Sequence, residues 1–176
     1  MLPRQTLANY LALRERLDQF ARRVTEGFAS DLACRAGCDS CCRHLTLFPV
    51  EAYAVLAALH GLPAEQQVLI RERARQATPE CCPLLLDGLC QLYVARPLIC
   101  RTHGLPLLVV TADTKTVDYC PQNFAGISSL PGWAVLDLEQ MNAALTAINA
   151  LFIREAHGEV EDRRLSLAET LLLPLP

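Results

Sequence analysis

The chain has 176 residues, of which 52% are hydrophobic and 6% aromatic, and its formal net charge at pH 7 is −3. A chain of this length buries about 70% of its unfolded surface as one compact domain, so it forms a core without needing cysteine cross-links. The near-neutral charge and the scarcity of aromatic side chains argue against a nucleic-acid-binding surface.

The N-terminal segment Met1–Thr6 has neither an apolar run nor a small-residue cleavage site, so we expect no signal peptide. No stretch of the sequence approaches about 18 uninterrupted apolar residues, so we expect no membrane-spanning helix. The sequence therefore predicts a cytoplasmic protein with no membrane partner. Disulfides are rare in that reducing compartment, so the nine cysteines indicate metal ligation or redox chemistry.

Apolar residues spaced by three or four positions predict helices in five parts of the chain. Thr6 is the expected N-cap of the first helix, and Ser166 with Glu169 forms a capping box at the start of the last. The predicted helices span Thr6–Ala29, Pro49–His60, Pro63–Gln76, Trp133–Ala156 and a short segment between Ser166 and Pro174.

Short strands are expected between the third and fourth helices. Leu105–Thr111 and Lys115–Tyr119 predict one short β-hairpin, and Asp87-Gly88 predicts a tight turn between two further segments. The expected fold is therefore mainly α, a single small domain over residues 1–176. About five helices surround a cysteine-rich metal-binding core at about 30–121. Three larger side chains are expected to pack in the interior: Tyr93, Trp133 and Met141.

Four cysteines fall within nine residues, at Cys34, Cys38, Cys41 and Cys42. A thiolate is a soft ligand that selects zinc or iron–sulfur iron over magnesium or calcium. Cys38 and Cys41 have the two-residue spacing of a metal-binding turn, and Gly37 lets backbone amides face bound sulfur or metal. Adjacent side chains at Cys41 and Cys42 tend to diverge. This favours a polynuclear site, or two neighbouring sites, over one mononuclear ion.

Five more cysteines follow, at Cys81, Cys82, Cys90, Cys100 and Cys120. Their spacings match neither a zinc ribbon, in which two CxxC turns face each other, nor the usual ferredoxin runs. Spacing alone leaves zinc and iron–sulfur both open.

Three stretches of the chain form one combined pattern. The first is Cys34-x3-Cys38-x2-Cys41-Cys42, the second runs from Cys82 to Tyr93, and the third is Arg96-Pro97-Leu98-Ile99-Cys100-Arg101. This combination resembles the bacterial CxxCxxCC cysteine-cluster family over about residues 34–103. The resemblance implies a site that chelates zinc or iron, and it supplies no reaction.

The resemblance also indicates which individual cysteines belong to the motif. It implies that Cys82 rather than Cys81 is the motif cysteine, which leaves Cys81 as a surplus thiol. Three residues separate Cys34 from Cys38 where the family pattern has two, so Cys34 is the least secure ligand of the first loop. A related cysteine domain occurs in bacterial flagellin lysine methylases, where an iron–sulfur cluster is implied. That relation favours iron over zinc.

Arg96 and Arg101 flank Cys100 within the resembling motif, and their guanidinium groups are expected to support the site by offsetting thiolate charge. His103 is expected to hydrogen-bond to a ligand, the alternative being that it ligates in place of one cysteine. The candidate metal ligands are eight cysteines: Cys34, Cys38, Cys41, Cys42, Cys82, Cys90, Cys100 and Cys120.

The leading hypothesis is a metal-binding protein that ligates an iron–sulfur cluster or iron through these thiolates. The alternatives are a structural or chaperone-type zinc protein, an iron–sulfur oxidoreductase component, a metal-delivery protein and a metal-free redox sensor. No dinucleotide fingerprint, P-loop or HExxH motif is present in the sequence, so no catalytic residue is assigned. The sequence identifies no protein partner.

Overall fold

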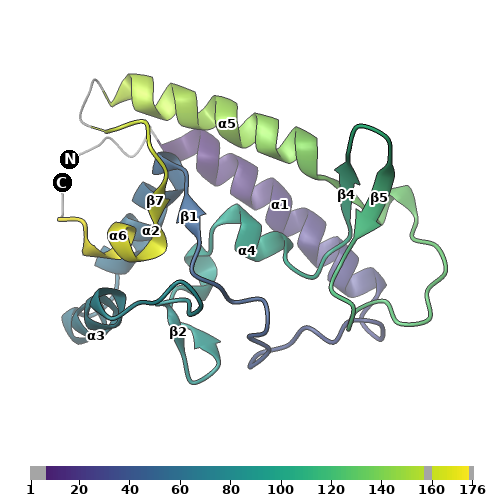
Figure 1. Cartoon of the computed structure of the whole chain (residues 1–176), viewed down its shortest axis with the longest axis horizontal. Helices are drawn as coiled ribbons and strands as arrows, with labels where there is room; N and C mark the ends of the chain where they lie inside the picture. Colours follow the sequence, from purple (N-terminus) through teal and green to yellow (C-terminus); the bar gives the residue numbers. More distant parts are fainter. Residues whose placement is uncertain (1–6, 157–159, 175–176) are drawn as a thin grey trace.

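The computed structural model describes residues 7–156 and 160–174. Within these ranges the chain forms six α-helices and several short strands (Figure 1), which confirms the mainly α class. None of these helices combines the length and apolar character that a membrane crossing requires. The helices are α1 (Ala8–Gly27), α2 (Pro49–His60), α3 (Ala64–Arg75), α4 (Leu98–Thr102), α5 (Leu138–Glu155) and α6 (Leu167–Leu172).

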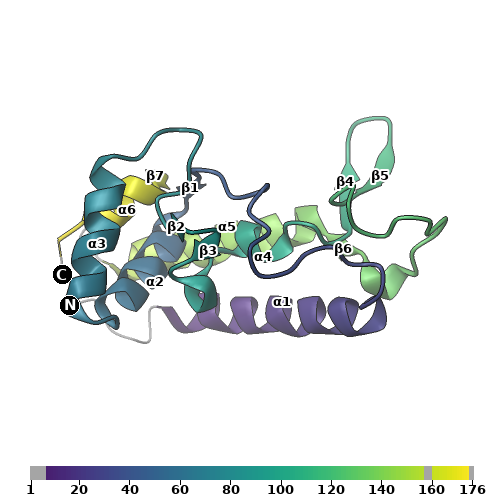
Figure 2. The same cartoon turned by 90° about the horizontal axis from the view of Figure 1, so that it is seen from below.

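Among the described residues, the strands are short and form three separate small sheets. Strand β4 (Leu107–Val110) pairs antiparallel with β5 (Lys115–Asp118) and parallel with β6 (Leu136–Asp137). The β4–β5 pair is the predicted hairpin, and it projects from one end of the molecule (Figure 2). The other two sheets pair β1 (Thr46–Leu47) with β7 (Leu165–Ser166), and β2 (Leu85–Leu86) with β3 (Leu89–Cys90).

Asp87 and Gly88 form the turn between β2 and β3, as predicted. Both residues have positive φ, +50° and +75°. Positive φ at both central residues is the geometry of a two-residue hairpin turn, and Asp-Gly is a favoured sequence for it.

The long helices largely match the prediction. The second helix has the predicted bounds, and the third lies within one residue of them at each end. The capping box of α6 is confirmed, because Ser166 Oγ accepts from Glu169 N–H at 3.1 Å and Glu169 Oε2 accepts from Ser166 N–H at 2.7 Å. Thr6, the expected cap of α1, lies outside the described residues.

The predicted start of the fourth helix at Trp133 is wrong. Residues Gly132–Ala134 form a single 3₁₀ turn, β6 follows, and α5 begins only after Asp137. The Asp137 carboxylate accepts from Gln140 N–H at 2.9 Å and caps the helix. The pairing of β6 with β4 keeps the residues before this cap extended.

Two of the three expected core side chains are not buried. Tyr93 is 60% exposed and Trp133 is 38% exposed, whereas Met141 is buried as predicted. An arginine lies over each exposed ring, with the guanidinium carbon of Arg96 at 3.6 Å from the Tyr93 ring centre and that of Arg23 at 4.6 Å from Trp133. Cation–π packing therefore covers aromatic surface that the sequence pattern assigned to the interior.

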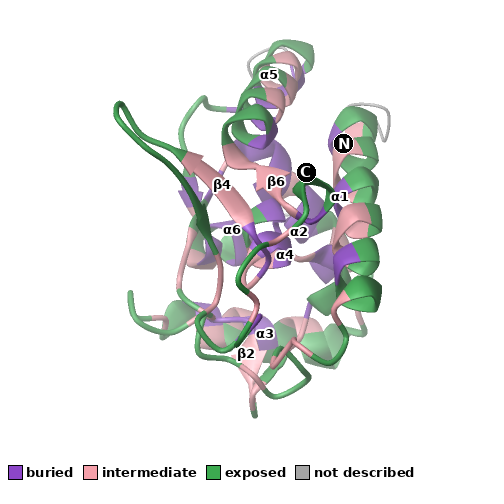
Figure 3. Ribbon diagram, turned by 90° about the vertical axis from the view of Figure 1, so that its right-hand side faces the viewer, coloured by how far each residue is buried: buried purple, intermediate pink, exposed green. Residues whose placement is uncertain are grey.

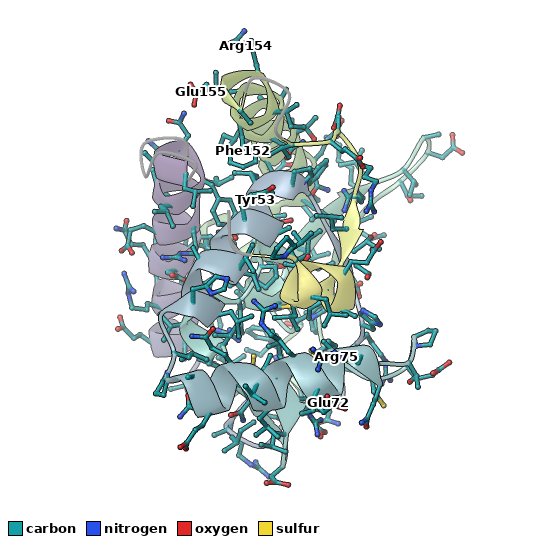
Figure 4. The ribbon with its side chains drawn as sticks, turned by 90° about the vertical axis from the view of Figure 1, so that its left-hand side faces the viewer. Tyr53, Glu72, Arg75, Phe152, Arg154 and Glu155 are labelled. Atoms are coloured by element: carbon teal, nitrogen blue, oxygen red, sulfur yellow. The ribbon has the colours of Figure 1, made fainter. Side chains whose placement is uncertain are left out.

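The core has three parts, and α2 lies between two of them. One part joins α2 to α1 and α5, which run side by side, and includes the ring contact between Tyr53 and Phe152 at 5.5 Å (Figure 4). The second joins α2 to α3 and α6, and Cys82 and Cys90 pack against it. The third lies at the C-terminal end of α1, around Phe124. Figure 3 shows α1 with its inner positions buried and its outer face exposed.

Candidate metal centre

The first cysteine loop leaves α1 and runs along one side of the molecule to β1 (Figure 1). Two consecutive turns shape it. Cys38 N–H donates to Arg35 O at 3.0 Å, and Cys42 N–H donates to Asp39 O at 2.8 Å. Gly37 has φ +88°, which glycine adopts without strain. The turns therefore gather the cysteines of the loop on a short length of backbone.

The second cysteine segment is the β2–β3 hairpin. Cys90 pairs with Leu85, whose N–H donates to Cys82 O at 3.0 Å, so the two cysteines lie at the same end of the hairpin. At the turn, a Cβ placed on Gly88 would lie 3.6 Å from Gly37 Cα. The hairpin thus lies directly against the first loop.

Cys100 lies on α4, a helix of five residues that the sequence did not predict. The N–H of Leu98, in its first turn, donates at 3.0 Å to the buried carboxylate of Glu51 on α2. Burial raises the pKa of this Glu51 carboxyl. The position of α4, and with it that of Cys100, is therefore set by a contact with α2.

Four half-buried thiols affect one another's ionisation: Cys42, Cys82, Cys90 and Cys100, here called the inner thiol group. Burial raises the pKa of Cys100 to about 12, and negative charge at Cys82 and Cys90 adds to the rise. Burial also raises the pKa of Cys82 to about 11, with further contributions from Cys90 and Cys42. Without a cation among them, these thiols are protonated at neutral pH.

Arg96 provides a positive charge next to the inner thiol group. Its guanidinium acts against burial and lowers the pKa of Cys42, Cys90 and Cys100. The side chain is held by the Tyr93 ring beneath it and by a hydrogen bond from Nε to Tyr93 O at 3.0 Å. The Arg96 charge therefore acts on three of these sulfurs, and its role at a metal site stays a prediction.

Arg101 is buried and is directed elsewhere. Its Nε donates to Arg96 O at 2.7 Å, Nη2 donates to Val94 O, and Nη1 pairs with Asp18 on α1. These bonds fix the backbone segment that carries Arg96. Arg101 therefore contacts the backbone beside Arg96 and Asp18 of α1, and its predicted role beside the thiols stays a prediction.

The remaining predicted ligands are Cys34, Cys38, Cys41 and Cys120, here called the outer thiol group. Burial raises the pKa of Cys41, and charge at Cys42, Cys34 and Cys38 raises it further. A Cβ at Gly104 would lie 2.9 Å from Cys34 Sγ and 3.7 Å from Cys120 Cβ, which places Cys120 on the Cys34 side.

Cys41 and Cys42 join the two groups. The sequence favoured side chains that diverge at these neighbours, but each of the two thiols contributes to the pKa shift of the other. The two turns of the loop bend the backbone enough to bring adjacent thiols together. All eight predicted ligands are thus distributed over two groups that meet at Cys41 and Cys42.

Cys81 and His103, whose roles as ligands the sequence did not decide, differ in their surroundings. Cys81 is exposed, and its N–H donates to Thr78 O at 3.3 Å. His103 is half-buried, and burial lowers the pKa of its ring, which favours the neutral form that a metal ligand or a hydrogen-bonding imidazole needs.

The donor set fits zinc or iron in its chemistry. Thiolates are soft ligands, which zinc and iron accept, and the Arg96 guanidinium can offset part of their negative charge. Within residues 7–156 and 160–174, however, no three Cys, His, Asp or Glu side chains are already drawn together as a metal-binding cluster. The expected cysteine-rich metal core is therefore not formed in the described part of this structure, and the thiols would have to approach one another to ligate.

Two polar residues beside these segments were missed by sequence reasoning. Asn123 donates from Nδ2 to Cys34 Sγ at 3.3 Å, and His44 connects the end of the first loop to Thr78 O and to α6. An Asn two positions after Pro121 and a His two positions after Cys42 give only weak local signals. Their partners lie far away in the sequence, so spacing could not identify them.

Comparison with protein families gives one match. The family model described as "CxxCxxCC: Putative zinc- or iron-chelating domain" matches residues 33–121, half of the chain. Comparisons with curated proteins and with solved structures give no match. The matched span contains all nine cysteines and ends before Asn123.

Proposed function

The chain belongs to the CxxCxxCC family of zinc- or iron-chelating domains, and from this premise we propose that its inner thiol group forms a metal-chelating site. The observation that carries the proposal is that Cys82 and Cys90 lie at one end of a hairpin whose turn lies against the first cysteine loop. The mutual effects of Cys42, Cys82, Cys90 and Cys100 on their pKa values agree with this arrangement. Four thiolates are a complete ligand set for a tetrahedral ion and also for an iron–sulfur cluster.

Iron, held as an iron–sulfur cluster, is the first candidate. The outer thiol group continues directly from the inner one through Cys41 and Cys42, so more sulfur is available than a single zinc ion takes up. Thiolate ligands suit iron–sulfur iron, and the neighbouring arginine offsets their charge.

Structural zinc is the second candidate. The inner thiols come from the first loop, the β2–β3 hairpin and α4, which are irregular or very short elements. A closed four-cysteine zinc site commonly ties such segments together and contributes folding energy.

We place the protein in the cytoplasm, because disulfides are rare in that reducing compartment and thiolate ligation needs reduced cysteines. Chelation is the proposed activity, and no reaction is assigned to the chain. A role in electron transfer would require a metal centre that takes up and returns one electron, which a redox titration measures.

The proposal is tested by purifying the full chain without air and measuring iron, zinc and acid-labile sulfide per chain. Iron with a similar amount of sulfide, in a coloured protein, supports the cluster. Stoichiometric zinc in a colourless protein supports the structural site. A folded protein that holds neither metal, and takes up neither when iron, sulfide or zinc is supplied, would overturn the proposed function.

A further inference from the structure

Asn123 is a buried polar residue, 1% exposed, between the first cysteine loop and the segment around Gly104. Its Oδ1 accepts from Ala33 N–H at 2.9 Å, and its Nδ2 donates to Gly104 O at 2.8 Å and to Cys34 Sγ at 3.3 Å. Its backbone N–H donates to Cys120 O at 2.8 Å. One residue therefore contacts both ends of the outer thiol group.

Gly104 closes the other side of this arrangement. Its φ is +84°, and an added Cβ would lie 2.9 Å from Cys34 Sγ and 3.0 Å from Asn123 Nδ2. Contacts this short require the sulfur or the amide to move. The absence of a side chain at Gly104 is thus needed for Cys34 to remain in its present position.

A buried amide is costly unless its donors and acceptor are paired, and the Asn123 side chain pairs both. The Asn123 side-chain NH2 group donates both to the carbonyl oxygen of Gly104 and to the sulfur of Cys34, which is a weaker acceptor than oxygen. An N–H group that points at a sulfur stabilises the thiolate and adjusts its properties as a metal ligand. The Asn123 side chain therefore does more than connect two segments, because it also donates to a candidate metal ligand.

We propose that Asn123 is a positioning residue of the metal centre, which holds Cys34 next to Cys120 and makes this pair a part of the ligand set. This inference rests on the proposed function. It assigns a role to a residue outside the matched family span, and it turns Cys34 from the least secure ligand into one with a dedicated hydrogen-bond donor.

The test measures binding of Co²⁺, a spectroscopic substitute for zinc or iron, through the near-ultraviolet band that thiolate ligation produces. Asn123→Ala removes every side-chain contact. Asn123→Asp keeps an acceptor for Ala33 N–H and loses the donors to Cys34 and Gly104. Both variants are expected to weaken Co²⁺ binding by about tenfold or more, as loss of a hydrogen bond to a metal ligand does.

The same substitutions are then made in a Cys34→Ser background. If Asn123 acts through the Cys34 sulfur, the further loss in that background is less than about twofold, because the two changes remove the same interaction. An equal loss in both backgrounds would overturn the inference. So would wild-type binding by Asn123→Asp, since that variant lacks the donor to the Cys34 sulfur.

Gly104→Ala and Gly126→Ala provide an independent matched pair. Both glycines have positive φ, +84° and +86°, so alanine strains the backbone similarly at each, but no atom lies within 4 Å of a Cβ at Gly126. We expect Gly104→Ala to reduce the thiolate band per bound Co²⁺ and Gly126→Ala to leave it unchanged. Equal bands in the two variants would contradict the positioning role.

The outcomes separate this inference from the proposed function. A wild-type protein that binds no Co²⁺, zinc or iron overturns both. Loss of binding in Cys82→Ser together with unchanged binding in both Asn123 variants overturns the positioning role alone.

Discussion

Arg96 places a fixed positive charge beside Cys42, Cys90 and Cys100, and this gives the first prediction at the scale of single residues. Replacing it in Arg96→Gln leaves the charge of the ligating thiolates uncompensated. We expect the affinity for zinc to fall by about tenfold, measured by competition with a coloured chelator.

A matched control for Arg96 lies on α3. Arg75 is exposed and pairs with Glu72 at 2.8 Å (Figure 4). Arg75→Gln removes the same charge from the protein as a whole and is expected to leave zinc affinity unchanged. Equal losses in both variants would show that only net charge matters.

Cys81 and Cys82 are neighbours in the sequence with different surroundings, and they provide the second prediction. Cys82 packs against the core and belongs to the inner thiol group, whereas Cys81 is exposed. Cys82→Ser is expected to abolish stoichiometric metal binding, because it removes one of four ligands. Cys81→Ser is expected to keep the metal content of the wild type, measured by elemental analysis. A greater loss from Cys81→Ser than from Cys82→Ser would reverse this assignment.

At the scale of elements, His44 connects three segments. Its Nε2 accepts from Ala168 N–H in the first turn of α6 at 3.1 Å, so Nδ1 carries the proton and donates to Thr78 O at 3.1 Å. His44→Ala removes both bonds and is expected to lower the free energy of unfolding by about 1–3 kcal/mol, measured with urea.

Arg43 is the matched control for His44. It is the preceding residue and is exposed, so Arg43→Ala is expected to change the unfolding free energy by no more than about 0.5 kcal/mol. If the two variants were equally stable, the His44 contacts would contribute nothing to the link between the first loop and α6.

The elements that the sequence predicted well are those with a local signal. The apolar periodicity of α1, α2, α3 and α5 is present within each segment, and the Asp87-Gly88 turn needs only its own two residues. The five-residue helix α4 depends on the Glu51 carboxylate of α2, and the two-residue strands β1 and β7 depend on each other. Interactions that span such distances leave no periodic pattern, which explains why these elements were missed.

The candidate site likewise has features that the sequence indicates locally and features that depend on distant contacts. Cysteine spacing and the family resemblance named eight candidate ligands, which stay a prediction. They did not indicate which sulfurs lie together, because Cys42 and Cys100 are brought near each other only by the packing of α4 and the hairpin. Tyr93 was misplaced for a related reason. Its ring is covered by a charged side chain, and the apolar pattern cannot distinguish that from burial.

At the scale of the whole molecule, the buried thiols link stability to pH. Burial raises the pKa of Cys82 to about 11 and that of Cys100 to about 12, above the ordinary value of 9.0 that applies when the chain is unfolded. Between pH 9.0 and these raised values, the folded state binds more protons than the unfolded state. The stability of the metal-free protein therefore falls as pH rises through this range. Below about pH 8 the thiols are protonated in both states and the effect vanishes.

The metal-loaded protein is expected to behave differently, because its ligating sulfurs are already thiolates. Melting temperatures of the two forms, recorded from about pH 7 to about pH 10, should diverge as the metal-free form loses stability. Parallel curves would show that the inner thiols are not the ligands. The matching control is Cys82→Ser without metal, whose stability should fall less steeply with pH than that of the metal-free wild type.

The contact between Gly37 and Gly88 has a consequence for how closely two cysteine segments can pack. A Cβ placed on Gly88 would lie 3.6 Å from Gly37 Cα, so two backbones without side chains face each other there. A longer side chain at Gly88 would meet the backbone of the first loop. The spacing between the first loop and the β2–β3 hairpin, which both carry inner thiols, therefore depends on a small residue at the hairpin turn.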